Sequence, residues 1–181
     1  LLPALKNARN AAKLVKSLSN LRQINVGAAT YREDNKGYMP LAMTCDRGNY
    51  PNPPWYPTPN GYDGWCTWSY GGKNCDPFWF NEASGAFDVE AADRLVNPYI
   101  YPEVKYIAPD MPNRLAPTDP NRKNAQAEIF RDPSDQISYQ RSTTFSTNPT
   151  PGQISSYDDV GTSYHFNVKW WDQIPHGGNK F

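Results

Sequence analysis

The sequence predicts an α+β fold in which one long N-terminal helix packs on a small antiparallel β-sheet, with a large loop insertion. Apolar or small residues recur every three or four positions over residues 4–31, which is the helical period. Residues 41–81 carry six prolines and ten aromatic residues, which exclude a long helix there. Three later segments alternate in the manner of strands: Ala127–Arg131, Ser138–Thr144 and Ser163–Trp171.

The helix is predicted to run from near Ala4 to near Arg32, far longer than the roughly 11 or 12 residues of an average helix. It should end at Asp34-Asn35-Lys36-Gly37, because Asn and Gly favour the left-handed backbone that terminates helices, and Pro40 blocks continuation. A second, shorter helix is predicted from about Asp88 to Leu95. The chain of 181 residues thus divides into an N-terminal helix, 1–35, and a globular domain, 36–181, with the insertion at 41–81.

A helix of this length cannot bury its apolar stripe on a modest sheet alone. We therefore expect its second half to pack on the sheet through Leu18, Leu21 and Ile24, and the part before about Ala12 to stand free of the domain. The predicted contacts with other chains lie in this free part and comprise Leu1, Leu2, Leu5, Lys6, Arg9, Ala12 and Lys13.

The charge is balanced in total, with 18 basic and 18 acidic residues, which gives no indication of nucleic acid as a partner. The balance hides a division, because residues 1–32 hold six bases and no acid, so the remaining 149 residues carry a net charge of −6. Lys6, Arg9, Lys13 and Lys16 follow one another in steps of three and four, so they line one face of the helix. That face is either solvated, or faces anionic lipid, or pairs with the acidic part of a neighbouring copy.

The aromatic insertion has two interpretations. Trp and Tyr in proline-rich loops stack on sugars or bases in some proteins, but more often they form a small core beneath a loop. The candidate ligand-binding residues are Trp55, Trp65, Trp68 and Trp79. Whether they are buried or form an exposed row distinguishes the two interpretations.

The three cysteines, Cys45, Cys66 and Cys75, fit no zinc pattern. If the chain matures outside the cytoplasm, Cys66 and Cys75 are expected to form a disulfide, because the residues between them have the composition of a turn, and Cys45 then stays single or pairs between chains. The alternative is three reduced thiols.

Catalytic motifs are not evident, and we predict that the chain is not an enzyme. His165 falls on the polar side of a predicted strand and His176 precedes two glycines, so both are interpreted as exposed polar residues. Asp158 and Asp159 are weak candidates for oxygen ligands of Ca²⁺, but they lack the spacing of a known calcium loop. No cofactor is otherwise expected.

Several segments resemble the prepilin-type family, which comprises type IV pilin-like subunits and type II secretion pseudopilins. The most specific is the helix end, which reads Asn20-Leu21-Arg22-Gln23-Ile24, then Tyr31, then Asp34-Asn35-Lys36-Gly37-Tyr38 and Pro40. Further similarities are Arg94-Leu95-Val96-Asn97-Pro98-Tyr99-Ile100, Ile129-Phe130-Arg131-Asp132-Pro133-Ser134-Asp135 and Gly161-Thr162-Ser163-Tyr164-His165-Phe166-Asn167. Members of that family often carry Cys at the positions that match Ser17 and Asp132, where a bridge could tie the helix to the sheet, but this chain has neither cysteine.

The resemblance implies a structural subunit of a type IV pilus-like or type II secretion pseudopilus filament, with copies of itself or other pilin-like subunits as partners. Leu1–Leu5 would continue an apolar segment that holds the subunit in the inner membrane before assembly, and the assembled filament would lie at the cell surface or outside the cell. The competing hypothesis is an extracellular module that binds polysaccharide through the aromatic insertion.

Overall fold

The computed structural model describes residues 2–41, 43–44, 64–81, 87–102, 118–123, 126–138, 140 and 154–166. One long helix accompanies a pair of two-residue strands and several helical segments of three to five residues. In chain order the elements are α1 (Leu2–Asp34), β1 (Met43–Thr44), β2 (Gly64–Trp65), α2 (Phe78–Asn81), η3 (Ala91–Asp93), α3 (Asn97–Ile100), η4 (Pro120–Lys123), η5 (Glu128–Phe130) and α5 (Ser156–Val160), where η marks a 3₁₀ helix.

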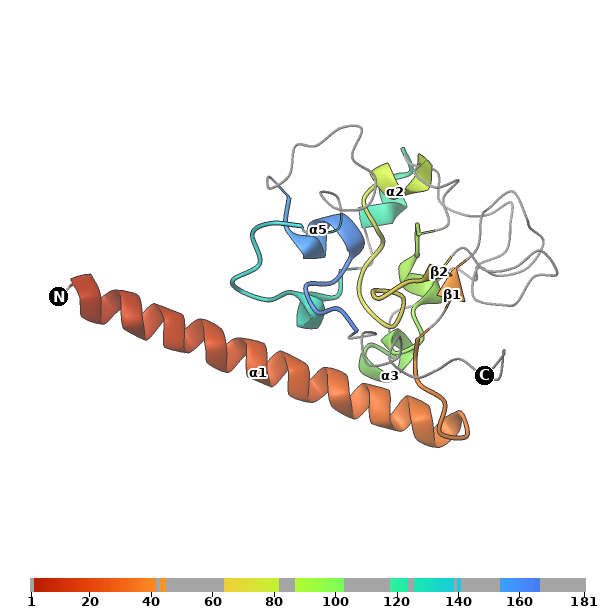
Figure 1. The fold of residues 1–181 in the computed structure, drawn as a ribbon, viewed down its shortest axis with the longest axis horizontal. Coiled ribbons are helices and arrows are strands. Elements are labelled where there is room, and N and C mark those ends of the chain that lie inside the picture. Colours follow the sequence, from red (N-terminus) through yellow and green to blue (C-terminus); the bar gives the residue numbers. More distant parts are fainter. Residues whose placement is uncertain are drawn as a thin grey trace.

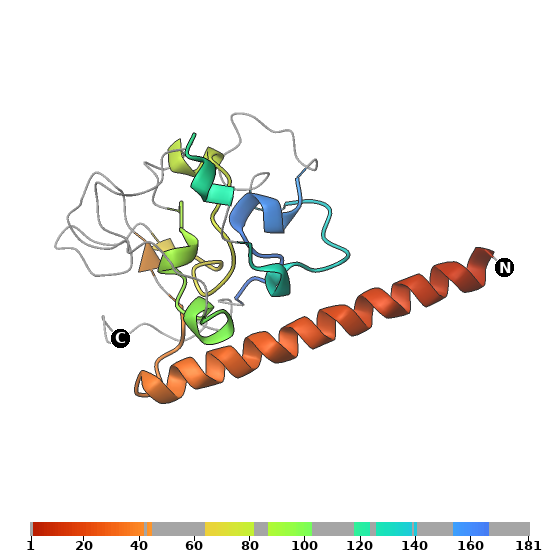
Figure 2. The same cartoon turned by 180° about the vertical axis from the view of Figure 1, so that it is seen from behind.

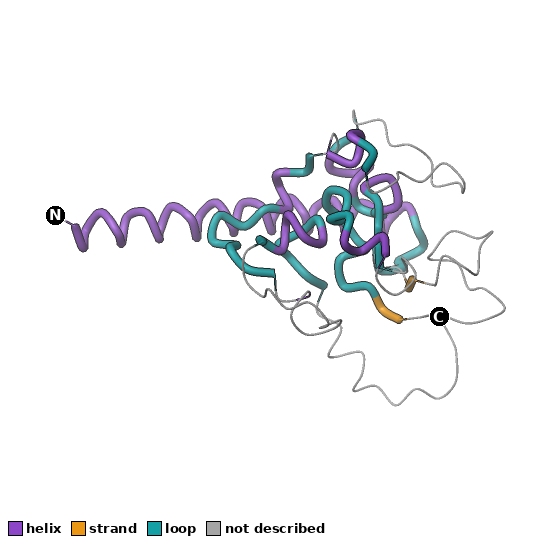
Figure 3. The backbone as a smooth tube through the Cα atoms, turned by 90° about the horizontal axis from the view of Figure 1, so that it is seen from above, coloured by secondary structure: helices purple, strands orange, loops and turns teal. Residues whose placement is uncertain are grey.

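The long helix α1 confirms the prediction of one continuous N-terminal helix. It runs along one side of the globular part, and its N-terminal end projects well beyond that part (Figures 1 and 3). The helix ends where the sequence indicates, because Lys36 and Gly37 both have positive φ and the Gly37 N–H donates to the Arg32 carbonyl oxygen at 2.8 Å.

The face of α1 that packs on the globular part differs from the predicted one. Asn20, Ile24 and Gly27 are buried, whereas Leu18 is 57% exposed and Leu21 37% exposed. The prediction was therefore right for Ile24 and wrong for the two leucines. The opposing surface comes from α3 and η5, and a Cβ atom built on Gly27 would lie 2.7 Å from Cγ1 of Ile100, which shows how closely α3 approaches the helix backbone.

The predicted antiparallel sheet under the helix is wrong, and with it the α+β fold class. The described part of the chain is helical and irregular, and its strand pairing is limited to the two residues of β1 and the two of β2, with Met43 opposite Trp65 and Thr44 opposite Gly64. The segment expected as strand 127–131 forms η5 instead. Ser138 and residues 163–166 are irregular, and the rest of those two predicted strands lies outside the described residues, apart from Gln140.

The backbone of these segments is satisfied by side chains in place of a sheet ladder. The Ala127 N–H donates to the Tyr157 hydroxyl, and the Ile129 N–H donates to the Tyr101 hydroxyl, both at 3.0 Å. Side-chain acceptors thus take N–H groups that a neighbouring strand would take in a sheet. The predicted helix over 88–95 is likewise reduced to η3, which covers only three of those residues.

The globular part lies above α1 in Figure 2. Its described buried apolar residues form two clusters, of which the first also includes Ile24 of α1. The cluster next to α1 contains Ile24, Tyr70, Val96, Ala127, Ile129, Phe130 and Tyr157. The second cluster contains Cys66, Trp68, Cys75, Trp79, Val89 and Val160. The last part of the predicted insertion therefore belongs to the main core.

One fully buried arginine organises the irregular segments around the core. Arg94 donates from one terminal nitrogen to the carbonyl oxygens of Trp68 and Gly71, at 2.6 and 2.9 Å. Its other terminal nitrogen donates to the carbonyl oxygens of Val89 and Val160, at 3.1 and 2.7 Å. The guanidinium fork thus joins three chain segments, two of which are irregular while the third is the C-terminal end of α5.

Candidate functional site

The free part of α1 is the first candidate for function, and it is exposed as predicted. Every residue of 2–12 is exposed, and Lys13 is the first residue of the helix that is partly covered. Of the predicted contact residues, Leu2, Leu5, Lys6, Arg9 and Ala12 lie in this free part, whereas Leu1 lies outside the described residues. Within the described residues, no helix is long and apolar enough to cross a membrane.

The basic residues of the free part continue the face that packs on the globular part. Positions 6, 9, 13, 17, 20 and 24 follow one another in steps of three and four, so they lie along one side of the helix. Ser17, Asn20 and Ile24 contact the globular part, while Lys6 and Arg9 extend the same side beyond its edge. Among the described residues neither of these two cations has an ion pair.

The opposite side of α1 carries apolar side chains that the globular part does not cover. Leu14, Val15, Leu18 and Val26 are each more than half exposed, and Leu21 is partly exposed. We call these five residues the outer face of α1. Exposed apolar side chains that gather on a surface commonly mark sites of protein–protein contact. The sequence pattern did not predict it, because the leucines were expected to pack on the domain.

A polar contact joins the middle of α1 to the globular part. The Ser17 hydroxyl donates to Oδ2 of Asp132 at 2.6 Å, and the Tyr164 hydroxyl donates to Ser17 at 3.2 Å. Nearby, the Asn20 side-chain amide donates to the Arg131 carbonyl oxygen at 2.9 Å. The structure thus places Ser17 and Asp132, which are far apart in the sequence, side by side.

The tryptophans of the insertion do not form an exposed row where the structure describes them. Trp68 and Trp79 are 5% and 0% exposed and stack on each other at 5.3 Å between ring centroids. The Trp79 indole N–H donates to Asp159, and that of Trp68 donates to the Phe87 carbonyl oxygen. These two rings are therefore part of the apolar core. Trp55 and the side chain of Trp65 lie outside the described residues.

The two described cysteines, Cys66 and Cys75, are buried free thiols in the same cluster. Burial raises the pKa of both, that of Cys75 to about 12, and Cys75 lies 3.3 Å from a terminal nitrogen of Arg94. Such thiols react slowly with alkylating reagents while the chain is folded. The disulfide between them is absent in this structure and stays a prediction, and Cys45 lies outside the described residues.

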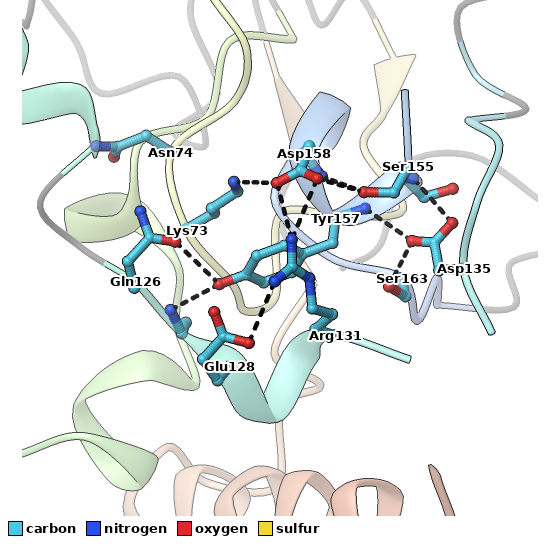
Figure 4. Close-up of polar contacts among 12 residues, drawn as sticks. Lys73, Asn74, Gln126, Glu128, Arg131, Asp135, Ser155, Tyr157, Asp158 and Ser163 are labelled. Carbon is cyan, nitrogen blue, oxygen red and sulfur yellow. Dashed lines mark hydrogen bonds and ion pairs between the residues drawn. The ribbon is translucent and has the colours of Figure 1, made fainter. Parts of the chain in front are cut away.

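The two aspartates considered for Ca²⁺ are engaged in different contacts, and those of Asp158 are drawn in Figure 4. Asp158 accepts a hydrogen bond from Lys73 at 2.7 Å and pairs with Arg131 at 3.2 Å. Both cations also lie over the Tyr157 ring, at 4.4 and 4.7 Å from its centroid. Asp159 is fully buried and accepts from Trp79 and Ser138.

The charges around Asp158 determine its protonation. Partial burial acts to raise its pKa, but hydrogen bonds from Lys73 and Ser155 and the charges of Lys73 and Arg131 lower it below the ordinary value of 3.8. Asp158 is therefore a carboxylate paired with two cations, which leaves it poorly suited to a calcium site. Within the described ranges, no group of three or more His, Cys, Asp or Glu residues is placed to hold a metal ion.

The histidines show no catalytic arrangement where they are described. His165 lies largely buried, with Nδ1 at 3.1 Å from the Thr67 hydroxyl and 3.4 Å from the Gln140 amide. Burial lowers its pKa, so the ring is neutral at pH 7. The prediction that this residue is an exposed polar position is wrong, because its ring also packs against Trp68. His176 lies outside the described residues.

Comparisons with known proteins identify no relative of this chain. No family model matches the chain, and neither the curated proteins nor the solved structures compared with it give a match. The indications of function are therefore the short segments that resemble the prepilin-type family and the exposed surfaces of α1.

Proposed function

We propose that this chain is a structural subunit of a type IV pilus-like or type II secretion pseudopilus filament, which assembles through α1. The observation that carries the proposal is the projecting end of α1, in which residues 2–12 are helical although all of them are exposed. A helix draws most of its stability from tertiary packing of one face. Packing against α1 of other subunits would supply that contact for the free part and for the outer face.

The distribution of charge favours an open assembly of identical subunits. Lys6 and Arg9 extend beyond the edge of the chain's own globular part, while the chain beyond residue 32 has a net charge of −6. A basic surface on one copy and an acidic surface on the next are different patches, so their contact is head to tail. Head-to-tail contacts that do not close into a ring generate a helical fibre.

The contact between Ser17 and Asp132 supports the family resemblance. The two residues are 115 positions apart in the chain, and both match positions at which family members often carry cysteine. Their hydrogen bond connects α1 with the globular part, as the resemblance implies that a bridge between cysteines at these positions would do in family members. The partners would then be further copies of this chain or other pilin-like subunits, at the membrane before assembly and at the cell surface afterwards.

The proposal is tested by reversing the charge of Lys6, Arg9 and Lys13, which we call the basic stripe of α1. Replacing Lys6, Arg9 and Lys13 together by Glu should abolish filaments, observed by electron microscopy of cells expressing the chain, because acidic surfaces would then face acidic surfaces. The urea midpoint of the purified chain should hardly change, since exposed substitutions usually alter stability by no more than about 0.5 kcal/mol each.

A matched control reverses three exposed bases elsewhere, namely Arg22, Arg32 and Lys36. It changes the net charge equally but spares the stripe, so filaments should persist. Equal loss of filaments in both variants would mean that the change in net charge, and not the position of the stripe, prevents assembly. Normal filaments from the first variant, or filaments that contain none of this chain, would contradict the proposal.

A further inference from the structure

A groove lies between α1 and the globular part, on the flank of the helix. Its volume is about 550 Å³, which falls within the roughly 300–1,000 Å³ of small-molecule sites. The apolar part of its lining, which we call the floor, comprises Ile100, Tyr101, Ile129 and Pro133. The polar part, which we call the rim, comprises Lys16 and Gln23 from α1, and Glu128 and Arg131 from η5 and the residue that follows it. We propose that this groove binds a uronic acid unit of an acidic polysaccharide.

The mixture of polar groups on the rim favours a sugar over an acidic peptide. Lys16 and Arg131 are donors only, the Glu128 carboxylate is an acceptor only, and the Gln23 amide is both. Sugar hydroxyl groups both donate and accept, so they satisfy all of these groups. The acidic side chains of a peptide offer carboxylates that accept only, so they bring no donor to the acceptor groups of Glu128 and Gln23.

The floor fits the apolar face of a pyranose ring. Tyr101 is half-buried and held in place, because its hydroxyl accepts a hydrogen bond from the Ile129 N–H at 3.0 Å. The aromatic ring of Tyr101 offers a π surface of the kind against which the C–H groups of a sugar pack, and the ring of Pro133 and the neighbouring isoleucines add apolar surface.

The charges around the groove select an acidic sugar. Arg131 is already paired with Glu128 at 3.6 Å and with Asp158 at 3.2 Å, as Figure 4 shows. Lys16 has no ion pair with a described residue, and the residues of α1 that precede it include further bases and no acid. Its ammonium group matches one carboxylate per site. The groove is therefore complementary to a single uronate within a chain.

The test titrates trigalacturonate into the purified chain and follows binding by isothermal calorimetry. Saturable binding is expected, and the fully methyl-esterified trisaccharide, which has the same rings without charge, should bind about tenfold or more weakly. In the variant Lys16→Gln, affinity for trigalacturonate should fall to that of the ester. The matched control Lys6→Gln removes an equal charge from α1 away from the groove and should bind as the wild type does.

Glu128→Gln removes an acceptor for sugar hydroxyl groups and should weaken binding of the methyl-esterified trisaccharide, whose lack of charge isolates this hydrogen bond. No saturable heat, or equal binding by wild type and Lys16→Gln, would overturn the proposal. Tighter binding of hexaglutamate than of trigalacturonate would also overturn it and would make the groove a peptide site. Because the assay uses the isolated chain, its result is independent of whether filaments form.

Discussion

The helix α1 and the globular part are held in shape by different means. In α1, hydrogen bonds within the helix satisfy the backbone, and only Asn20, Ile24 and Gly27 are buried in its 33 residues. In the described globular part the longest helix, α5, has five residues, and buried side chains such as Arg94 satisfy much of the backbone. The shape of α1 is therefore local, whereas the shape of the globular part depends on a few buried polar groups.

The largest expected effect comes from Arg94. Replacing it by Met removes the donors for four carbonyl oxygens in a fully buried place. Each buried acceptor left unsatisfied costs about 1–3 kcal/mol, so the loss should exceed about 4 kcal/mol, a large part of the roughly 5–15 kcal/mol that stabilises a domain. Urea unfolding followed by near-UV circular dichroism should show a chain without cooperative tertiary structure.

The matched variant in the helix is Arg9→Met, which removes the same group from an exposed place. Its urea midpoint should stay close to that of the wild type. Arg94→Lys keeps the charge but loses the fork that reaches two carbonyl oxygens from each nitrogen, so it should also be strongly destabilised. A stable Arg94→Met variant would refute the contrast between the two regions.

The boundary between the regions is tested at Gly27. In Gly27→Val the side chain would meet Ile100 and Val96 at 3.0 Å or less from its first atom, and overpacking of this kind costs about 1–3 kcal/mol. Ala29→Val places the same side chain on the exposed side of the same helix and should cost no more than about 0.5 kcal/mol. Equal urea midpoints in the two variants would show that α3 does not approach α1 closely.

The smallest effect concerns the pH dependence that Asp158 contributes. Its pKa is lowered in the folded chain, so unfolding raises its proton affinity. The resulting stability is present above pH 3.8 and is lost as the pH falls through the lower pKa of the folded state. Because the side chain is 40% exposed, the contribution should be no more than about 1 kcal/mol.

Urea midpoints measured between pH 7 and pH 3 check this prediction. Asp158→Asn should lower the urea midpoint at pH 7. The midpoint of this variant should also fall less steeply between pH 7 and pH 3 than that of the wild type. The control in α1 is Glu33→Gln, an exposed carboxyl without an ion pair to a described residue, which should leave both unchanged. A decline in Asp158→Asn as steep as in the wild type would assign the acid sensitivity to other groups.

The sequence predicts the local features of this fold and fails for the non-local ones. The bounds of α1 follow from a period of 3.6 and from Asn35 and Gly37, which act within a few residues of one another. The sheet was predicted from alternation at 127–131, but the N–H groups there bond to the hydroxyls of Tyr157 and Tyr101. These partners are about 30 residues away, and no periodic pattern reports them.

The choice of the buried face of α1 failed for a related reason. Hydrophobicity favours Leu18 over Asn20, but Asn20 is buried because Arg131 offers its carbonyl oxygen to the side-chain amide. Gly27 is buried because α3 comes within contact of the backbone. The basic stripe and the free end of the helix were predictable from periodicity, whereas the groove was not, because its lining comes from three separate segments.

The contacts of α1 determine how the molecule bears a mechanical load. The helix contacts the globular part at several points between its middle and its C-terminal end. The contacting residues are Ser17, Asn20, Ile24, Gly27 and Tyr31. A force that pulls the free end of α1 along its axis therefore loads all of these contacts in parallel, in shear. A force across the axis would peel them apart one after another, beginning at Ser17. The molecule should accordingly resist a pull along the axis of α1 far better than a bend near Ser17, where the free part of the helix leaves the globular part.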